Sequence, residues 1–268
     1  MPPLHLHNIQ YTQLDDMTWC AAAQVTAPDP INPPDPLDPP DSLDPPDSLT
    51  PLGHSALFSH ARTATASLSA REIAQQQRQQ QRAGVRLLLQ SLLNKINISD
   101  TLDDSGFPYR LISSQYFVCF SHTGAHSKTI HSKSASTQRK NEKLSNDLSN
   151  KVAVVISAHR PAGIDIETNY VEWRVAQRFY HANEIAVLQT LSTMQRDTAA
   201  KLLWQIKESF IKIHQYKLAQ GLGMDYSYLI ADLINGSSEK KPPLIVIKDT
   251  KSDYRIVLLL SQQIVIVY

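Results

Sequence analysis

Two carboxylates separated by one residue, Asp165 and Glu167, are the pair in this sequence best suited to hold a metal ion. They stand in the segment Gly-Ile-Asp-Ile-Glu, residues 163–167, which reads as a strand with its isoleucines toward the core. In a strand, side chains at i and i+2 point to the same face. Two carboxylates held close together repel each other, and a hard cation such as Mg²⁺ relieves that repulsion. The spacing predicts a divalent-metal site, although an ordinary alternating surface strand also explains it.

A second group of reactive side chains falls in Trp-Gln-Ile-Lys-Glu-Ser-Phe-Ile-Lys, residues 204–212. On a helix, Trp204, Glu208 and Lys212 lie on one face at i, i+4 and i+8. Glu208 would supply a third carboxylate, and Lys212 would neutralise an anionic oxygen beside the metal. A surface Glu–Lys pair, which contributes only ~0.3–0.5 kcal/mol, is the alternative interpretation of this motif.

A third group is a row of arginines on a predicted helix. Ser69 and Glu72 form a capping box, and residues 73–96 are rich in helix formers with an apolar end. Arg78, Arg82 and Arg86 recur at i, i+4 and i+8, so they share one face. That face is either solvated or a stripe that binds anions.

The elements that must position these residues alternate between strand and helix. A short first strand is expected around residues 4–9, and a buried strand at 111–122 ends at Ser121-His122. Helices are expected across residues 171–218. Further strands are expected at residues 151–157, 162–167, 226–234, 243–248 and 254–268. This order predicts an α+β fold.

The chain divides into three parts by composition. Residues 1–68 hold the first strand and an acidic segment, since ten of the 16 prolines fall between residues 28 and 51. Proline fixes φ and removes an amide donor, so this segment is expected to be an extended, flexible linker. Residues 69–160 form the next part, with a flexible polar insertion at 123–150, and residues 161–268 form the part that carries the metal site.

Composition places the chain among globular proteins. It has 268 residues, of which 42% are hydrophobic, but no apolar run of ~18 residues that would span a bilayer. The N-terminus lacks a signal-peptide pattern, and Cys20 and Cys119 stand outside any Cys/His cluster, so a cytoplasmic setting is expected. Residues 1–50 carry a charge of −8 and the rest +9, which favours an anionic ligand or partner for the basic part.

The three motifs Ser-His-Thr-Gly at residue 121, the 163–167 segment and the 204–212 segment, in that order, resemble the 4'-phosphopantetheinyl transferase superfamily, in its larger, monomeric, Sfp-type branch. The resemblance implies two similar α/β halves related by a pseudo-two-fold axis, with coenzyme A in the cleft between them. It implies Mg²⁺-dependent transfer of the 4'-phosphopantetheine arm to a serine of an acyl or peptidyl carrier protein. The products would be holo-carrier protein and 3',5'-ADP, and neither nucleic acid nor membrane is an expected partner.

The resemblance also assigns roles around the metal. Asp165, Glu167 and Glu208 match the Mg²⁺ ligands, which would offset charge on the reacting phosphate groups. Glu208 is also the candidate base for the carrier serine. Lys212 matches the lysine that contacts the phosphates and stabilises the leaving oxygen, whereas Lys207 belongs to the motif without a clear role.

For coenzyme A, the resemblance assigns contacts from the first half. His122, with Ser121 beside it, would contact a phosphate. Arg86 matches the arginine that grips the 3'-phosphate, and Arg82 and Arg78 are further candidates for the same cluster, since arginine suits phosphate geometry.

The chain departs from the family pattern in three places. Gly106-Phe107-Pro108 stands where the family often has Gly-Lys-Pro, so one phosphate-contacting lysine is missing. About 28 residues follow the Ser-His-Thr motif before the next strand, and Gly221-Leu222-Gly223 comes nine residues after Lys212. None of these removes a predicted metal ligand.

Two alternatives remain open. Residues 163–168 also resemble the first metal-binding motif of DnaQ-like 3'–5' exonucleases, but that class needs further aspartates in a matching context and leaves residues 204–212 unexplained. The second alternative is an inactive relative that only binds carrier protein, and it predicts coenzyme A binding that does not respond to Mg²⁺.

Overall fold

The computed structural model of the chain describes residues 4–26, 69–123, 150–236 and 244–268. The proline-rich segment and nearly all of the predicted insertion at 123–150 lie outside these ranges. Within the described ranges, no helix has the length and apolar character needed to cross a membrane.

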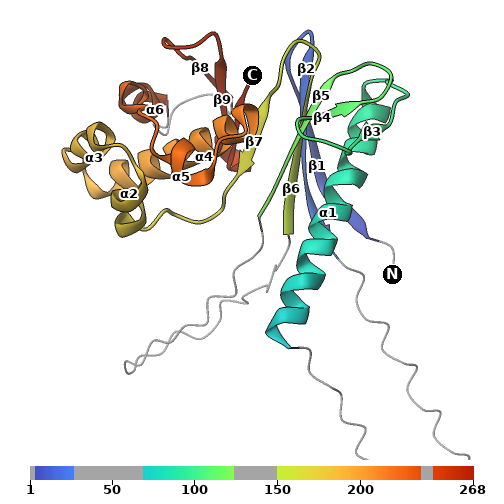
Figure 1. Cartoon of the computed structure of the whole chain (residues 1–268), viewed down its shortest axis with the longest axis horizontal. Coiled ribbons are helices and arrows are strands. Elements are labelled where there is room, and N and C mark those ends of the chain that lie inside the picture. The colour runs from blue at the N-terminus through green and yellow to red at the C-terminus, as the bar shows by residue number, and fades with distance from the viewer. Residues whose placement is uncertain (1–3, 27–68, 124–149, 237–243) are drawn as a thin grey trace, which may run out of the picture.

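The first sheet has six antiparallel strands in the order β1-β2-β6-β5-β4-β3. Their bounds are β1 His5–Asp15, β2 Thr18–Thr26, β3 Leu102–Asp103, β4 Tyr109–Leu111, β5 Phe117–Thr123 and β6 Asn150–Ser157. Helix α1, Ala70–Lys95, covers one face of this sheet (Figure 1). Leu88 and Leu92 of α1 pack there with Val152 and Val154 of β6, all of them fully or almost fully buried.

The second sheet has four antiparallel strands in the order β7-β10-β9-β8, and its helices lie on the side away from the first sheet (Figure 1). The strands are β7 Gly163–Ile166, β8 Ile245–Lys248, β9 Arg255–Leu259 and β10 Ile264–Val267. The helices are α2 Trp173–Phe179, α3 Ala182–Gln189, α4 Thr193–His214, α5 Leu218–Leu222 and α6 Ile230–Gly236, with short 3-10 turns η1 Ser227–Leu229 and η2 Leu260–Gln262. Helix α4 packs directly on β7 and β10.

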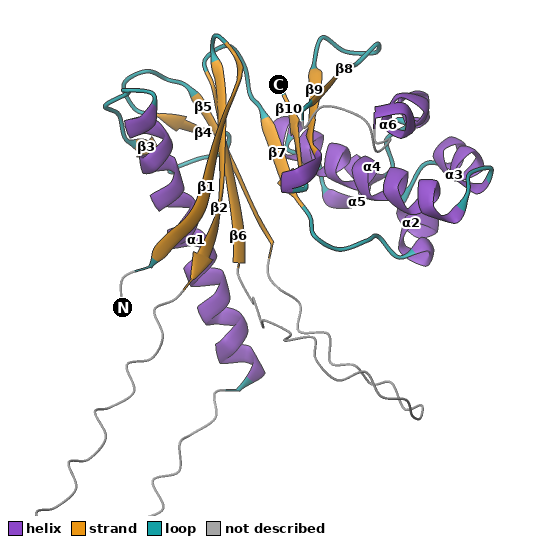
Figure 2. Cartoon of the chain, turned by 180° about the vertical axis from the view of Figure 1, so that it is seen from behind, coloured by secondary structure: helices purple, strands orange, loops and turns teal. Residues whose placement is uncertain are grey.

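The two sheets meet through a common apolar layer, so the described chain has helix, sheet, sheet and helix layers (Figure 2). Cys20, Cys119 and Val155 from the first sheet pack there with Ile164 and Ile266 from the second. Both cysteines are therefore buried free thiols, and burial raises the pKa of Cys20 to about 12. The expectation of an α+β fold is confirmed as a mixed fold with two antiparallel sheets.

Several predicted elements are confirmed. The Ser69–Glu72 capping box begins α1, with Ser69 Oγ accepting from the amide of Glu72. The strands at 151–157, 162–167 and 243–248 correspond to β6, β7 and β8, and the helical stretch at 171–218 contains α2, α3 and α4.

Four predictions of local structure need correction. Residues 5–26 form a hairpin, β1 and β2, where one short strand was expected, and the strand at 111–122 is broken by a turn in which Gln115 has φ of 60°. Residues 226–234 are helical in η1 and α6 because Leu229, Ile230 and Leu233 are buried with helical spacing. Residues 254–268 form β9 and β10 with η2 between them.

Candidate active site

Asp165 joins the two halves at the centre of the predicted site. It lies on β7, is 8% exposed, and its Oδ1 accepts hydrogen bonds from Ser121 Oγ of β5 at 3.0 Å and from Lys212 Nζ of α4 at 3.1 Å. Gly163 makes this approach possible, because a Cβ there would lie 2.1 Å from the backbone oxygen of Ser209 in α4. Strand β7 and helix α4 can pack this closely only with glycine at that position.

Ser121 is buried and faces β7. This position differs from the contact with coenzyme A that was predicted for Ser121. Its hydroxyl donates to Asp165 and accepts the amide of Ile166 at 3.1 Å, and its exposed fraction is 5%. Ser121 therefore positions the Asp165 carboxylate, a role that the sequence motif did not reveal.

Glu208 and Lys212 lie one turn apart on α4, as the motif predicted. Burial raises the pKa of Glu208, and the negative charges of Asp165 and Glu167 raise it further against the opposing charge of Lys212. Burial by itself would lower the pKa of Lys212, but the charge and hydrogen bond of Asp165 outweigh this and raise it. Lys212 is therefore a firmly held cation, and it also donates to the backbone oxygen of Ile164 at 2.7 Å.

The three predicted metal ligands fit a hard cation by their chemistry. Asp165, Glu167 and Glu208 supply carboxylate oxygens, which Mg²⁺ prefers. The raised pKa of Glu208 comes first from burial and then from the negative charges of Asp165 and Glu167, a repulsion that a cation would relieve. Glu167 is held by Asn169, whose backbone and side-chain nitrogens donate to its Oε1 at 2.8 and 3.2 Å. Among residues that the structure describes, no three ligating side chains already enclose a metal position. The metal assignment remains a prediction.

A cationic cleft of about 430 Å³ opens beside Lys212 on the α1 side of the first sheet. Its charged and aromatic lining combines both halves of the fold: Arg82, Arg86, Asp104, Phe107, Tyr109, Phe120, His122 and Lys212. Desolvation lowers the pKa of His122, and the charges of Lys212 and Arg82 lower it further, so the imidazole is neutral at pH 7. The structure thus brings together four of the residues predicted to bind coenzyme A, whereas Arg78 lies on α1 outside this lining.

The wall of this cleft is aromatic where the family pattern has a lysine. Phe107 meets Tyr109 edge-on at 5.2 Å between ring centroids, and Tyr109 lies 5.8 Å from Phe120. Gln215, at the end of α4, donates to the backbone oxygen of Phe107 at 3.1 Å. The loop that contains Phe107 is therefore tied to the helix that carries Glu208 and Lys212.

Lys207, whose role the sequence left open, is a structural residue. It is fully buried, and its Nζ lies 2.8 Å from Glu184 Oε2 of α3. It also donates to the backbone oxygens of Leu222 and Met224 at 2.6 and 2.5 Å, so all three of its protons are used. Glu184 was missed in the sequence, where its only signal is the capping box that it forms with His181.

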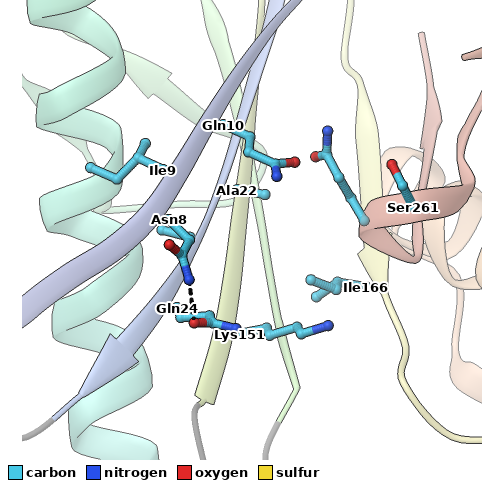
Figure 3. Close-up of a pocket in the computed structure, with 10 residues that line it drawn as sticks. Asn8, Ile9, Gln10, Ala22, Gln24, Lys151, Ile166 and Ser261 are labelled. Atoms are coloured by element: carbon cyan, nitrogen blue, oxygen red, sulfur yellow. Dashed lines mark hydrogen bonds between the residues drawn. The ribbon is translucent and has the colours of Figure 1, made fainter. Parts of the chain in front are cut away.

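A second hollow, also of about 430 Å³, lies between the first sheet and η2 (Figure 3). Its lining includes amide side chains, among them Gln10 and Gln24, and Lys151, whose Nζ donates to Gln263 Oε1 at 3.1 Å. None of the predicted site residues lines it, so it is separate from the cleft beside Lys212.

Comparison with known proteins gives two findings. Residues 161–263 match the family model described as the 4'-phosphopantetheinyl transferase superfamily. A stretch of 62 residues is 40% identical to a protein of Aneurinibacillus migulanus named 4'-phosphopantetheinyl transferase gsp, covering 23% of this chain and 26% of that protein. The match thus spans about a quarter of the relative's length.

The fold and site therefore define a mixed α/β protein with a cationic cleft next to the carboxylate of Asp165. The resemblance seen in the motifs is confirmed: residues 161–263, which carry Asp165, Glu208 and Lys212, match the model of the 4'-phosphopantetheinyl transferase superfamily.

Proposed function

We propose that this protein transfers the 4'-phosphopantetheine arm of coenzyme A to a serine of an acyl or peptidyl carrier protein, which leaves 3',5'-ADP. One observation carries the proposal. Lys212 reaches the Asp165 carboxylate of the predicted metal site and also lines the cleft that contains Arg82, Arg86 and His122. Phosphate groups bound in that cleft would contact Lys212 and would therefore lie next to the Asp165 carboxylate.

The residues of the cleft divide the binding of coenzyme A between them. Arg86 and Arg82 offer guanidinium groups to the 3'-phosphate, and the neutral imidazole of His122 offers a hydrogen bond to a further phosphate oxygen. The rings of Phe107 and Tyr109 supply an apolar wall in place of a lysine. Lys212, held in its charged form by Asp165, lies where it can neutralise charge on the oxygen that leaves with 3',5'-ADP.

The second half of the site would activate the acceptor. Burial raises the pKa of Glu208 toward the working pH, as suits a general base that takes the proton of the carrier serine. Ser121 and Asn169 hold Asp165 and Glu167 in place. When bound by these carboxylates, Mg²⁺ would supply charge stabilisation for the pyrophosphate group.

Acceptor access is proposed on the Glu167 side of the site. A shallow hollow there is lined by Glu167, Tyr170, Val171 and Trp204, and Tyr170 is 71% exposed. Lys201 lies nearby with its Nζ 5.7 Å from the ring centroid of Tyr170. Lys201 and the ring of Tyr170 suit an acidic protein surface, whereas the carboxylates of Glu167 and Glu172 in the lining do not.

Further parts of the proposal follow from the family. The two sheets with their helices would be the two halves related by a pseudo-two-fold axis, and the protein would act as a cytoplasmic monomer without nucleic acid. Of the two alternatives, the exonuclease is disfavoured by the match of residues 161–263 to the transferase superfamily. An inactive relative is disfavoured by the presence of all three carboxylates together with Lys212.

The proposal is tested by intact-mass spectrometry. The protein is incubated with coenzyme A, Mg²⁺ and a panel of apo-carrier proteins, with EDTA in a parallel set. A mass gain of one phosphopantetheine arm on a carrier, absent with EDTA, is the expected result. If no carrier gains mass, the binding of coenzyme A with and without Mg²⁺ is measured; binding that ignores Mg²⁺ would identify an inactive relative and overturn the proposed activity.

A further inference from the structure

The guanidinium of Arg86, which we assign to a phosphate of coenzyme A, is already paired within the chain. Its Nη2 lies 2.5 Å from Asp104 Oδ2, and its Nη1 donates to the backbone oxygen of Arg82 at 3.2 Å. The side chains of Arg86 and Asp104 are each 51% exposed. This ion pair is open to solvent and to any ligand that enters the cleft.

The position of Asp104 makes the pair unusual. Among the described residues that line the cleft, Asp104 is the acidic one, and it shares the lining with the cations Arg82, Arg86 and Lys212. A carboxylate binds guanidinium with the same paired geometry as a phosphate. Asp104 therefore occupies Arg86 in the way that a phosphate of the substrate would.

The loop that carries Asp104 has room to change. Asp104 directly follows the two-residue strand β3, and a Cβ placed on the nearby Gly106 would meet no atom within 4 Å. The carboxylate of the preceding residue, Asp103, accepts hydrogen bonds from the amide and the hydroxyl of Ser105. Asp104 has no such local bond among the described contacts, so its carboxylate can leave Arg86 without unfolding the turn.

We propose that Asp104 sets the affinity and selectivity of the cleft by competing with the substrate for Arg86. A ligand with a phosphate at this position displaces the carboxylate, whereas a ligand that lacks it leaves the internal pair intact. The inference rests on the proposed function in one respect, the use of the 3'-phosphate of coenzyme A as the displacing group. Asp104 therefore reduces the preference of the cleft for coenzyme A over its 3'-dephospho form, compared with a neutral residue at the same position.

The change Asp104→Asn removes the competing charge and keeps the size of the side chain. Isothermal titration of the full chain is expected to show coenzyme A binding about three- to tenfold tighter, because no carboxylate then competes with the phosphate for Arg86. Binding of 3'-dephospho-coenzyme A should change by about twofold or less. Asp104→Glu, which keeps the charge, is the matched control and should stay near the wild-type affinity.

A double variant separates competition from structural effects. In an Arg86→Gln background, Asp104→Asn should no longer tighten the binding of coenzyme A. Equal or weaker binding in the folded Asp104→Asn single variant would overturn the proposal and would identify Asp104 as a residue that orients Arg86. If Asp104→Asn does not fold, Asp104→Ser is measured in its place. A gain in affinity in that variant supports the proposal, because damage to the fold would not tighten binding.

The same experiment distinguishes failure of this inference from failure of the proposed function. If the wild type binds no coenzyme A, inorganic pyrophosphate is titrated as a simple anionic probe of the cleft. Tighter pyrophosphate binding in Asp104→Asn, lost in the Arg86→Gln background, supports the competition even though the assigned substrate is wrong. An unchanged pyrophosphate affinity rejects it.

Discussion

The ammonium of Lys212 lies 3.1 Å from Oδ1 of Asp165. This contact joins the last turn of α4 to strand β7, although the two residues are 47 positions apart in the sequence. The contact explains why Lys212 keeps its charge in a partly buried site. Each lowers the cost of desolvating the other, and the pKa of Lys212 is raised as a result. Among the described residues, no cation lies as close to the Glu208 and Glu167 carboxylates, which is the arrangement a divalent ion would complete.

Replacing Asp165 by asparagine tests this arrangement. Asp165→Asn keeps the shape and the hydrogen bond from Ser121 but removes the charge that Lys212 and the proposed metal require. We expect transfer to fall by about 10²-fold or more, since a charge at the reacting centre is lost. The rate is measured by intact-mass spectrometry, and thermal unfolding checks that the fold is kept.

Two controls make this result specific. Asp253→Asn changes an aspartate outside the candidate site and should leave the rate unchanged, whereas Glu208→Gln should repeat the loss. Normal turnover in a folded Asp165→Asn protein would show that this carboxylate is not a metal ligand.

The pKa of His122 leads to a prediction for pH dependence. Desolvation and the charges of Lys212 and Arg82 lower this pKa below 6.5, against a smaller opposing effect of Asp165, so the imidazole is neutral in the empty cleft at pH 7. A bound phosphate favours imidazolium and raises the pKa in the complex. Binding must then take up a proton in the window between the two pKa values, and affinity for coenzyme A rises as pH falls through it.

Calorimetry can measure this proton uptake. Titrations of coenzyme A near pH 6 in two buffers of different ionisation enthalpy give the number of protons bound. The 3'-phosphate itself titrates near pH 6, so the comparison is between wild type and His122→Gln under the same conditions. Equal proton uptake in the two proteins would show that His122 does not contact a phosphate.

The residues that share a local motif were the ones that the sequence predicted well. Glu208 and Lys212 lie on one helix face because helical spacing alone places them there. Asp165 follows from the strand period, and Arg82 and Arg86 reach one cleft because their i, i+4 spacing on α1 holds. The fold class followed for the same reason, since the order of apolar strands and helices is local information.

Contacts between distant segments were not predictable in this way. Nothing near Asp104 in the sequence indicates that it meets Arg86, and Ser121 faces Asp165 only because β5 and β7 come from two sheets that pack together. The strand predicted at 226–234 was wrong because its β-branched and aromatic residues favour a strand locally, whereas burial against α4 selects helix. Tertiary packing decided each of these cases.

The buried pair of Lys207 and Glu184 predicts a large effect on stability. Lys207→Met leaves the Glu184 carboxylate, which is 0% exposed, without its cation in the protein interior. Removal of one partner of such a pair costs about 3–5 kcal/mol. Urea unfolding, followed by circular dichroism, measures the change in free energy.

A second change identifies the cause of that loss. The double variant Lys207→Met/Glu184→Gln has no uncompensated charge and should recover part of the stability. Lys201→Met, a partly exposed lysine on the same helix, should change the free energy of unfolding by about 0.5 kcal/mol or less. A loss in Lys207→Met no larger than in Lys201→Met would contradict the role of the buried pair.

The close packing of β7 on α4 gives a prediction that joins stability to the site. In Gly163→Ala, the new Cβ would lie 2.1 Å from the oxygen and 2.6 Å from the carbon of the Ser209 carbonyl. These are backbone atoms, so β7 and α4 must move apart, at a cost of about 1–3 kcal/mol or more. The movement also separates Asp165 from Lys212, so transfer should fall together with the free energy of unfolding. Gly106→Ala, with no atom within 4 Å of its Cβ position, is the matched control in urea unfolding and intact-mass assays and should leave stability near the wild-type value. If the two alanine variants are equally stable, the close contact between β7 and α4 does not constrain the site.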